Sequence, residues 1–171
     1  MTSKALLKHV FSEISLPARK ISEEDYKKNV KWIEDFKVDS TNTRQYERCK
    51  DIVSRYEDQQ KGIERFIPVE IHVIRLGEIA FATNPFELFL DYGIRIQARS
   101  PATQTFLVQL AGKGVPLGGT YLATERAEAG EGYSASVYCN QVGFQGGNKL
   151  VDETVKMIES TWGEVKGENE N

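Results

Sequence analysis

The segment VEIHVIRLGEIAFATNPFELFLDYGIRIQARSP, residues 69–101, decides the fold that we expect for this chain. At its start Val69, Ile71 and Val73 alternate with polar residues, which is the two-residue period of a half-buried strand. The sequence RLGE that follows is typical of a tight turn, and residues 79–82 continue as a second short strand. The first half of the segment therefore predicts a β-hairpin.

The second half predicts a helix between two strands. Leu88 to Arg99 are expected to be helical and to end before Pro101, because the residue that precedes a proline disfavours helical backbone. The next stretch, TQTFLVQLAG at residues 103–112, carries apolar side chains at alternate positions and predicts a strand. Strand, helix and strand with short joints make a βαβ unit, so we expect a parallel pair of strands with a right-handed crossover.

Helical spacing of apolar residues predicts three more helices around this centre. Residues 22–36, with Ser22 as the capping residue, and residues 43–60 are expected to form a helical hairpin. Residues 148–162 predict the last helix, and the acidic residues 164–171 are expected to be a polar tail.

The expected fold class is α/β, with a mixed α+β arrangement as the alternative. The expected order is an N-terminal helical hairpin, a β-hairpin, the βαβ unit, a glycine-rich loop region and a C-terminal helix. Residues 1–163 are expected to form a single α/β domain, because no linker divides them.

The glycine-rich region, residues 111–147, is too long for a simple connection in a compact domain, and such loops are usually functional or disordered. We expect it to be packed because of its aromatic and aliphatic residues, among them Val115, Leu117, Tyr121, Leu122, Tyr133 and Tyr138. It lacks the Gly-x4-Gly-Lys-Ser/Thr frame of a phosphate loop and the Gly-x-Ser-x-Gly of a nucleophile elbow.

Composition argues against several classes of function. The 171 residues are 40% hydrophobic and 27% charged, which is ordinary for a globular protein. A net charge of -3 without a basic stripe gives no indication of nucleic-acid binding. The apolar runs are too short to cross a bilayer, so we expect no transmembrane segment. The first twenty residues lack the features of a signal peptide, so the chain as written is expected to be cytoplasmic, while a secreted or periplasmic parent protein stays open.

The cysteines and histidines do not form a metal-binding pattern. Cys49 and Cys139 lie in no ligand spacing and are expected to be buried free thiols. His9 and His72 stand alone, and His72 is expected to be an exposed residue on the polar face of its strand. A zinc site built from several histidines and cysteines cannot be assembled from this chain.

Glu87 has two interpretations from the residues alone. Asn84 as N-cap, Pro85 at the first helical position and Glu87 at the third make a capping box, worth about 1 kcal/mol of helix stability. Alternatively Glu87 holds a ligand, because it follows a strand of the expected parallel pair and ligands gather outside the carboxyl ends of such strands. Tyr121 similarly defaults to a packed aromatic residue with a satisfied hydroxyl.

Several segments nevertheless resemble the end of the catalytic region of neutral/alkaline ceramidase-like proteins, especially their bacterial relatives. The resemblance extends from about residue 16 to 162 and is carried by LPARKISEEDY, VEIHVIRLGEIAFATNPFELFLDYGIRIQARSP, QTFLVQLAGKG, GGTYLATERAEAGEGYSA and GGNKLVDETVKMIESTW. The resemblance implies that the domain is the C-terminal part of a larger catalytic domain, which hydrolyses the amide bond of N-acylsphingosines with a zinc ion.

The resemblance also implies which residues are zinc ligands. In that family two histidines, a glutamate and a tyrosine hold the zinc, and the last two are similar to Glu87 and Tyr121 here. Phe86 replaces a glycine of the family turn, and the histidine ligands and a serine lie in an upstream region that this chain does not contain. We therefore expect the chain alone to be inactive and to need a missing upstream half or a partner chain, with a lipid amide as substrate. The alternative is a non-catalytic α/β binding or assembly domain that retains the scaffold.

Overall fold

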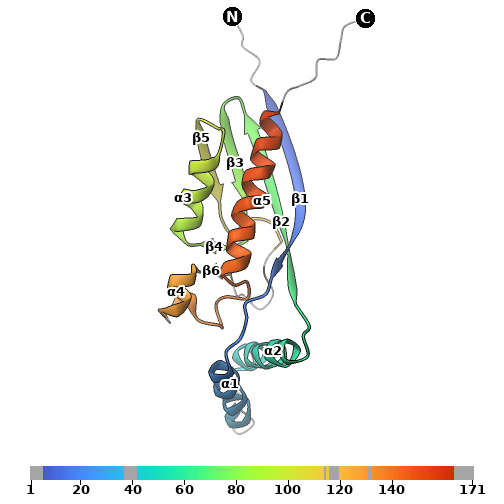
Figure 1. Cartoon of the computed structure of the whole chain (residues 1–171), viewed down its shortest axis with the longest axis vertical. Coiled ribbons are helices and arrows are strands. Elements are labelled where there is room, and N and C mark those ends of the chain that lie inside the picture. Colours follow the sequence, from blue (N-terminus) through green and yellow to red (C-terminus); the bar gives the residue numbers. More distant parts are fainter. Residues whose placement is uncertain (1–5, 37–41, 114, 116–119, 131, 164–171) are drawn as a thin grey trace, which may run out of the picture.

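The computed structural model describes residues 6–36, 42–113, 115, 120–130 and 132–163, which form a mixed α+β fold (Figure 1). Its main sheet has the strand order β1-β2-β3-β5. The strands are β1 (Leu7–Pro17), β2 (Phe66–Leu76), β3 (Ile79–Thr83) and β5 (Gln104–Val108). Strands β1 and β2 pair antiparallel, as do β2 and β3, whereas β3 and β5 are parallel.

The predicted β-hairpin and βαβ unit are both confirmed. Strands β2 and β3 meet at a turn in which Gly77 has a φ of 59°, a backbone conformation that favours glycine. Helix α3 (Leu90–Arg99) connects β3 to its parallel partner β5. Helix α3 ends at Arg99, as predicted. Strand β5 is shorter than the predicted strand, because Leu110 adopts a φ of 54° that extended backbone does not allow.

Strand β1 was not predicted, and the expectation that the fold starts with the helical hairpin is wrong. The strand pairs with the whole length of β2, from Leu7 opposite Leu76 to Pro17 opposite Phe66. Its apolar residues are distributed over both faces: Ile14 and Leu16 are buried, whereas Leu7 and Phe11 are exposed. This distribution hides the alternation by which a strand is recognised.

The helices α3 and α5 (Phe144–Trp162) cover one face of the sheet (Figure 1). Helix α5 begins four residues before the predicted start, and its first turn contains Gly146 and Gly147. A Cβ atom at Gly147 would overlap the ring of Tyr92 on α3, and one at Gly146 would overlap Val142. These two glycines therefore permit close packing and do not mark a loop.

The helical hairpin consists of α1 (Glu23–Phe36) and α2 (Thr43–Gln60), which lie within one residue of the prediction. The Ser22 hydroxyl accepts a hydrogen bond of 3.0 Å from the amide of Asp25, as expected of a capping residue. The hairpin extends from one end of the sheet (Figure 1), and Ile52 on α2 forms a small apolar cluster with Ile21 and Val137 outside the hairpin helices. Cys49 on α2 and Cys139 are buried free thiols, as predicted.

The opposite face of the sheet is open and apolar. Strands β1, β2 and β5 present large apolar side chains that are at least about one-third exposed: Leu7, Phe11, Ile74, Leu76, Phe106 and Val108. Strand β3 adds the half-buried Phe81. The rings of Phe81 and Phe106 stack with their centroids 5.1 Å apart. We call these residues the open face.

The described residues of the glycine-rich region include β6 (Tyr121–Leu122), α4 (Glu125–Ala129) and the 3-10 turn η2 (Tyr133–Ala135). Val115 and Leu122 are buried as expected, whereas Tyr133 is 79% exposed. Leu117 and the predicted tail lie outside the described residues. None of the helices in the described part combines the length and the apolar character that a membrane crossing requires.

Candidate functional site

Glu87 does not cap a helix, and the predicted capping box is wrong. The Asn84 Oδ1 accepts a hydrogen bond of 3.1 Å from the amide of Phe86, which closes a local turn before the helix. Helix α3 begins only at Leu90, and its N-cap residue Phe89 has no side-chain capping bond. Glu87 lies three residues before the helix, so its carboxylate has another role.

Glu87 belongs to a second, two-stranded sheet that the sequence did not reveal. Strand β4 (Glu87–Leu88) pairs in parallel with β6, and Glu87 lies directly opposite Tyr121. The amide of Glu87 donates to the Thr120 carbonyl at 2.9 Å, and that of Phe89 donates to the Leu122 carbonyl at 3.3 Å. This pairing occupies the backbone that a capping box would have used, which explains why the helix starts late.

The side chains of Glu87 and Tyr121, predicted as a pair of ligands, interact directly. The Thr120 hydroxyl donates to Glu87 Oε1 at 2.8 Å and so orients the carboxylate. The Glu87 carboxylate raises the pKa of Tyr121, by hydrogen bonding first and by its charge second. The Tyr133 ring lies edge-on to Tyr121, with centroids 6.2 Å apart. Two oxygen donors from separate segments are therefore brought to one place on the surface.

The main sheet holds β4 near the carboxyl ends of its parallel strands. The amide of Asn84, just after β3, donates to the Val108 carbonyl at 3.0 Å. The amide of Leu88 donates to the side chain of Gln109, just after β5, at 2.7 Å. This is the edge at which ligands collect in α/β sheets, as the sequence led us to expect.

Strand β6 is held from its other side by two buried polar groups. The Tyr92 hydroxyl on α3 donates to the Ala123 carbonyl at 2.8 Å, and Asn140 Oδ1 accepts from the Ala123 amide at 3.0 Å. Asn140 is fully buried, and its amide nitrogen donates to the Ser134 carbonyl at 2.6 Å. The position of Tyr121 is therefore set by a satisfied hydrogen-bond network.

The donors present fit half of a zinc site. Glu87 and Tyr121 supply two oxygen ligands, whereas a catalytic zinc site usually takes three protein ligands that include histidine. Within the described ranges no group of three or more His, Cys, Asp or Glu residues could hold a metal ion. His9 and His72 are on the open face, with His9 Nε2 and His72 Nδ1 3.0 Å apart. His72 is therefore partly buried against His9 and Phe11 and is not the lone exposed residue that we expected.

Thr120 is the site residue that sequence reasoning missed. Its role depends on the register between β4 and β6, which two-residue strands do not reveal as a pattern of hydrophobicity. Its position directly before Tyr121 could have indicated a role, because neighbouring residues of a strand bond to the same partner strand.

Comparison of the chain with protein-family models, with curated proteins and with solved structures finds no match. Its function is therefore argued from the geometry of the site.

Proposed function

We propose that the chain is the C-terminal portion of a zinc-dependent, ceramidase-like amide hydrolase, to which it supplies Glu87 and Tyr121 as metal ligands. One observation carries the proposal: the two residues, 34 positions apart, are paired in register on β4 and β6. The expectation of these two ligands came from sequence resemblance alone, so their direct pairing is independent support.

The chemistry of the pair agrees with such a role. A carboxylate and a phenolate are hard oxygen ligands, and a bound zinc would supply Lewis acidity to an amide carbonyl and its attacking water. Thr120 fixes one carboxylate oxygen, which restricts the orientation of Glu87 before a cation arrives. Without a cation Glu87 holds the phenol proton on Tyr121, since it raises the pKa of that residue.

The first test uses the isolated chain and the ultraviolet absorbance of ionised tyrosine. At neutral pH, where zinc stays in solution, we expect an excess of zinc to increase the absorbance of ionised Tyr121, because the cation reverses the electrostatic effect of the neighbouring carboxylate. The increase should be lost in Glu87→Gln and Tyr121→Phe and kept in Tyr133→Phe. If zinc acts equally on the wild type and on Glu87→Gln, the pair is not a metal site.

The second test needs the longer protein or the chain reconstituted with the region that supplies the other ligands. Glu87→Gln should abolish zinc-dependent hydrolysis of a fluorescent N-acylsphingosine, whereas Glu125→Gln on the exposed start of α4 should retain it. Full activity of Glu87→Gln would contradict the proposal.

The second candidate function is a non-catalytic binding or assembly domain, and the open face favours it. Contiguous exposed apolar side chains are rare on monomeric proteins and mark interaction surfaces. Under this function Glu87 only ties β4 to β6, so Glu87→Gln changes nothing beyond local stability. Phe106→Lys would then abolish assembly, measured as molar mass by light scattering, while Lys156→Gln on α5 serves as the control.

A further inference from the structure

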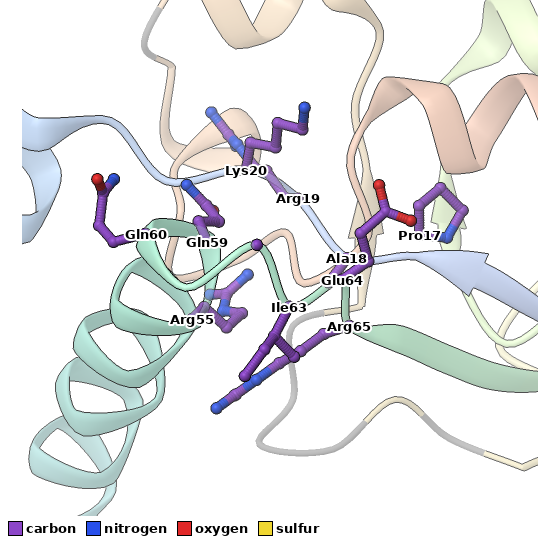
Figure 2. Close-up of a pocket in the computed structure, with 11 residues that line it drawn as sticks. Pro17, Ala18, Arg19, Lys20, Arg55, Gln59, Gln60, Ile63, Glu64 and Arg65 are labelled. Carbon is purple, nitrogen blue, oxygen red and sulfur yellow. The ribbon is translucent and has the colours of Figure 1, made fainter.

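A cavity of about 430 Å³ lies between the end of β1, the last turn of α2 and the segment that leads into β2 (Figure 2). Its lining contains four cationic side chains and one acidic side chain, Glu64. The cations are Arg19, Lys20, Arg55 and Arg65. None of the residues of the Glu87–Tyr121 pair lines it, so this cavity is a separate feature of the molecule.

Arg55 is a buried cation whose hydrogen bonds are incomplete. Its side chain is 5% exposed, and its only ion pair within the described residues joins Nε to Asp51 Oδ2 at 3.0 Å. Its Nε and Nη1 are both buried without a hydrogen bond of good geometry in the part of the chain that the structure describes. A buried guanidinium with unused donors is costly, because each lost hydrogen bond to water has to be replaced.

The surroundings of Arg55 do not compensate its charge fully. Asp51 is shared, since Arg65 Nη1 is also within 3.5 Å of its Oδ1. Burial lowers the pKa of Arg55 most, and the positive charges of Arg19 and Arg65 lower it further, while Asp51 acts in the opposite direction. One carboxylate therefore serves two guanidinium groups, with a third cation nearby.

The other two arginines are held in place by their own partners. Arg65 Nε binds Asp58 at 2.6 Å, and its Nη2 donates to the Ser54 hydroxyl at 2.5 Å. Arg19 donates to the Ala135 carbonyl and lies 3.6 Å from Glu128. These contacts fix two walls of the cavity before any ligand arrives. Lys20 lines the cavity, is exposed and makes no ion pair with the described residues.

We propose that this cavity binds the phosphate group of a small phosphomonoester, with Arg55 and Lys20 as its principal cationic contacts. A guanidinium presents paired N–H donors that match the oxygens of phosphate, and an exposed lysine of the lining adds a mobile point charge. The cavity is larger than one phosphate ion, and Pro17, Ala18 and Ile63 offer an apolar wall to the organic part of the ligand.

The test measures binding of inorganic phosphate, glycerol phosphate and vesicles containing phosphatidic acid to the intact chain by isothermal titration calorimetry. Ionic strength is matched with sodium chloride, because general screening changes all charged contacts. We expect saturable binding of both soluble probes, tighter for glycerol phosphate. Lys20→Gln should weaken it about tenfold, the equivalent of one charge-assisted hydrogen bond.

Lys27→Gln is the matched control, because Lys27 is an exposed lysine on α1, close to Lys20 in the chain, that does not line the cavity. Arg55→Met should abolish binding, and Lys20→Gln keeps the test decisive if that variant does not fold. Absence of saturable binding, equal losses in Lys20→Gln and Lys27→Gln, or binding to vesicles alone would each overturn the proposal. Glu87→Gln should bind phosphate normally, which separates this inference from the proposed hydrolase function.

Discussion

The two faces of the main sheet are built from the same strands but have different surroundings. On β2 the side chains of Val69, Ile71 and Val73 are fully buried beneath α5, whereas Ile74 on the same strand is 36% exposed. The open face mixes apolar side chains with His9, Glu70 and His72, whereas the covered face of β2 is apolar from Val69 to Val73. The difference shows that stability is concentrated on the face under the helices, while the other face is available to a partner.

The largest expected loss of stability comes from a substitution on the covered face that leaves the open face unchanged. Ile71→Ala should lower the free energy of unfolding by about 2–5 kcal/mol, because it removes buried methyl groups and leaves a cavity. Ile74→Ala, three residues along the same strand, should cost less than about 1 kcal/mol. Urea unfolding followed by circular dichroism compares the two variants. Similar losses would mean that the open face is covered in solution.

The second effect concerns the contact between the two covering helices. Gly147→Ala should destabilise the fold by about 1–3 kcal/mol, because the new Cβ overlaps the ring of Tyr92 and the helices must separate. Gly132→Ala is the control, since a Cβ there meets nothing within 4 Å. Thermal unfolding of both variants measures the difference. Equal midpoints would show that α3 and α5 are not packed as closely as the structure indicates.

Gly146 and Gly147 at the start of α5 also illustrate which parts of the fold the sequence predicts. Alternation in residues 69–73, and helical spacing on α1 and α2, correctly located the elements that bury one clear face. Gly146 and Gly147 were assigned to a loop, because Gly147 packs against Tyr92, 55 residues away in the chain, and Gly146 packs against Val142 and the end of β1. Close packing between distant segments has no local signal.

The sequence named two residues of the candidate site and did not reveal how they are held together. Glu87 and Tyr121 were chosen by resemblance, and their pairing across β4 and β6 followed no pattern of hydrophobicity. The capping box failed because a local motif competes with long-range strand pairing, which here occupies the backbone of Glu87 and Phe89. Arg55 was overlooked because a charged residue next to an apolar stripe is usually solvated.

The covered face also includes a buried hydroxyl, that of Tyr92 on α3, which makes its stability depend on pH. Burial is the main cause that raises the pKa of Tyr92 to about 12, above its ordinary value of 10.0. The folded state then holds this proton more tightly than the unfolded state, so its contribution is complete below pH 10 and is lost as the pH rises towards 12. The free energy of unfolding should fall by up to about 1.4 kcal/mol per pH unit in that range.

Tyr92→Phe isolates this contribution from those of the other tyrosines. At pH 8 it should cost about 1 kcal/mol, because the Ala123 carbonyl loses its hydrogen bond. Between pH 10 and 12 its stability should decline less steeply than that of the wild type. Parallel alkaline slopes in urea unfolding would show that Tyr92 titrates normally.

The smallest expected effect lies on the open face. The stacked pair of Phe81 and Phe106 should show a coupling energy of about 0.5 kcal/mol in a double-mutant cycle to alanine, since both rings remain partly hydrated. A partner that covers this face would desolvate the rings and raise the cost of each single substitution towards that of Ile71→Ala. The cycle measured by urea unfolding with and without the upstream region that the proposed function requires therefore tests whether the open face is the surface on which that region docks. An unchanged coupling energy would place the contact with the partner elsewhere.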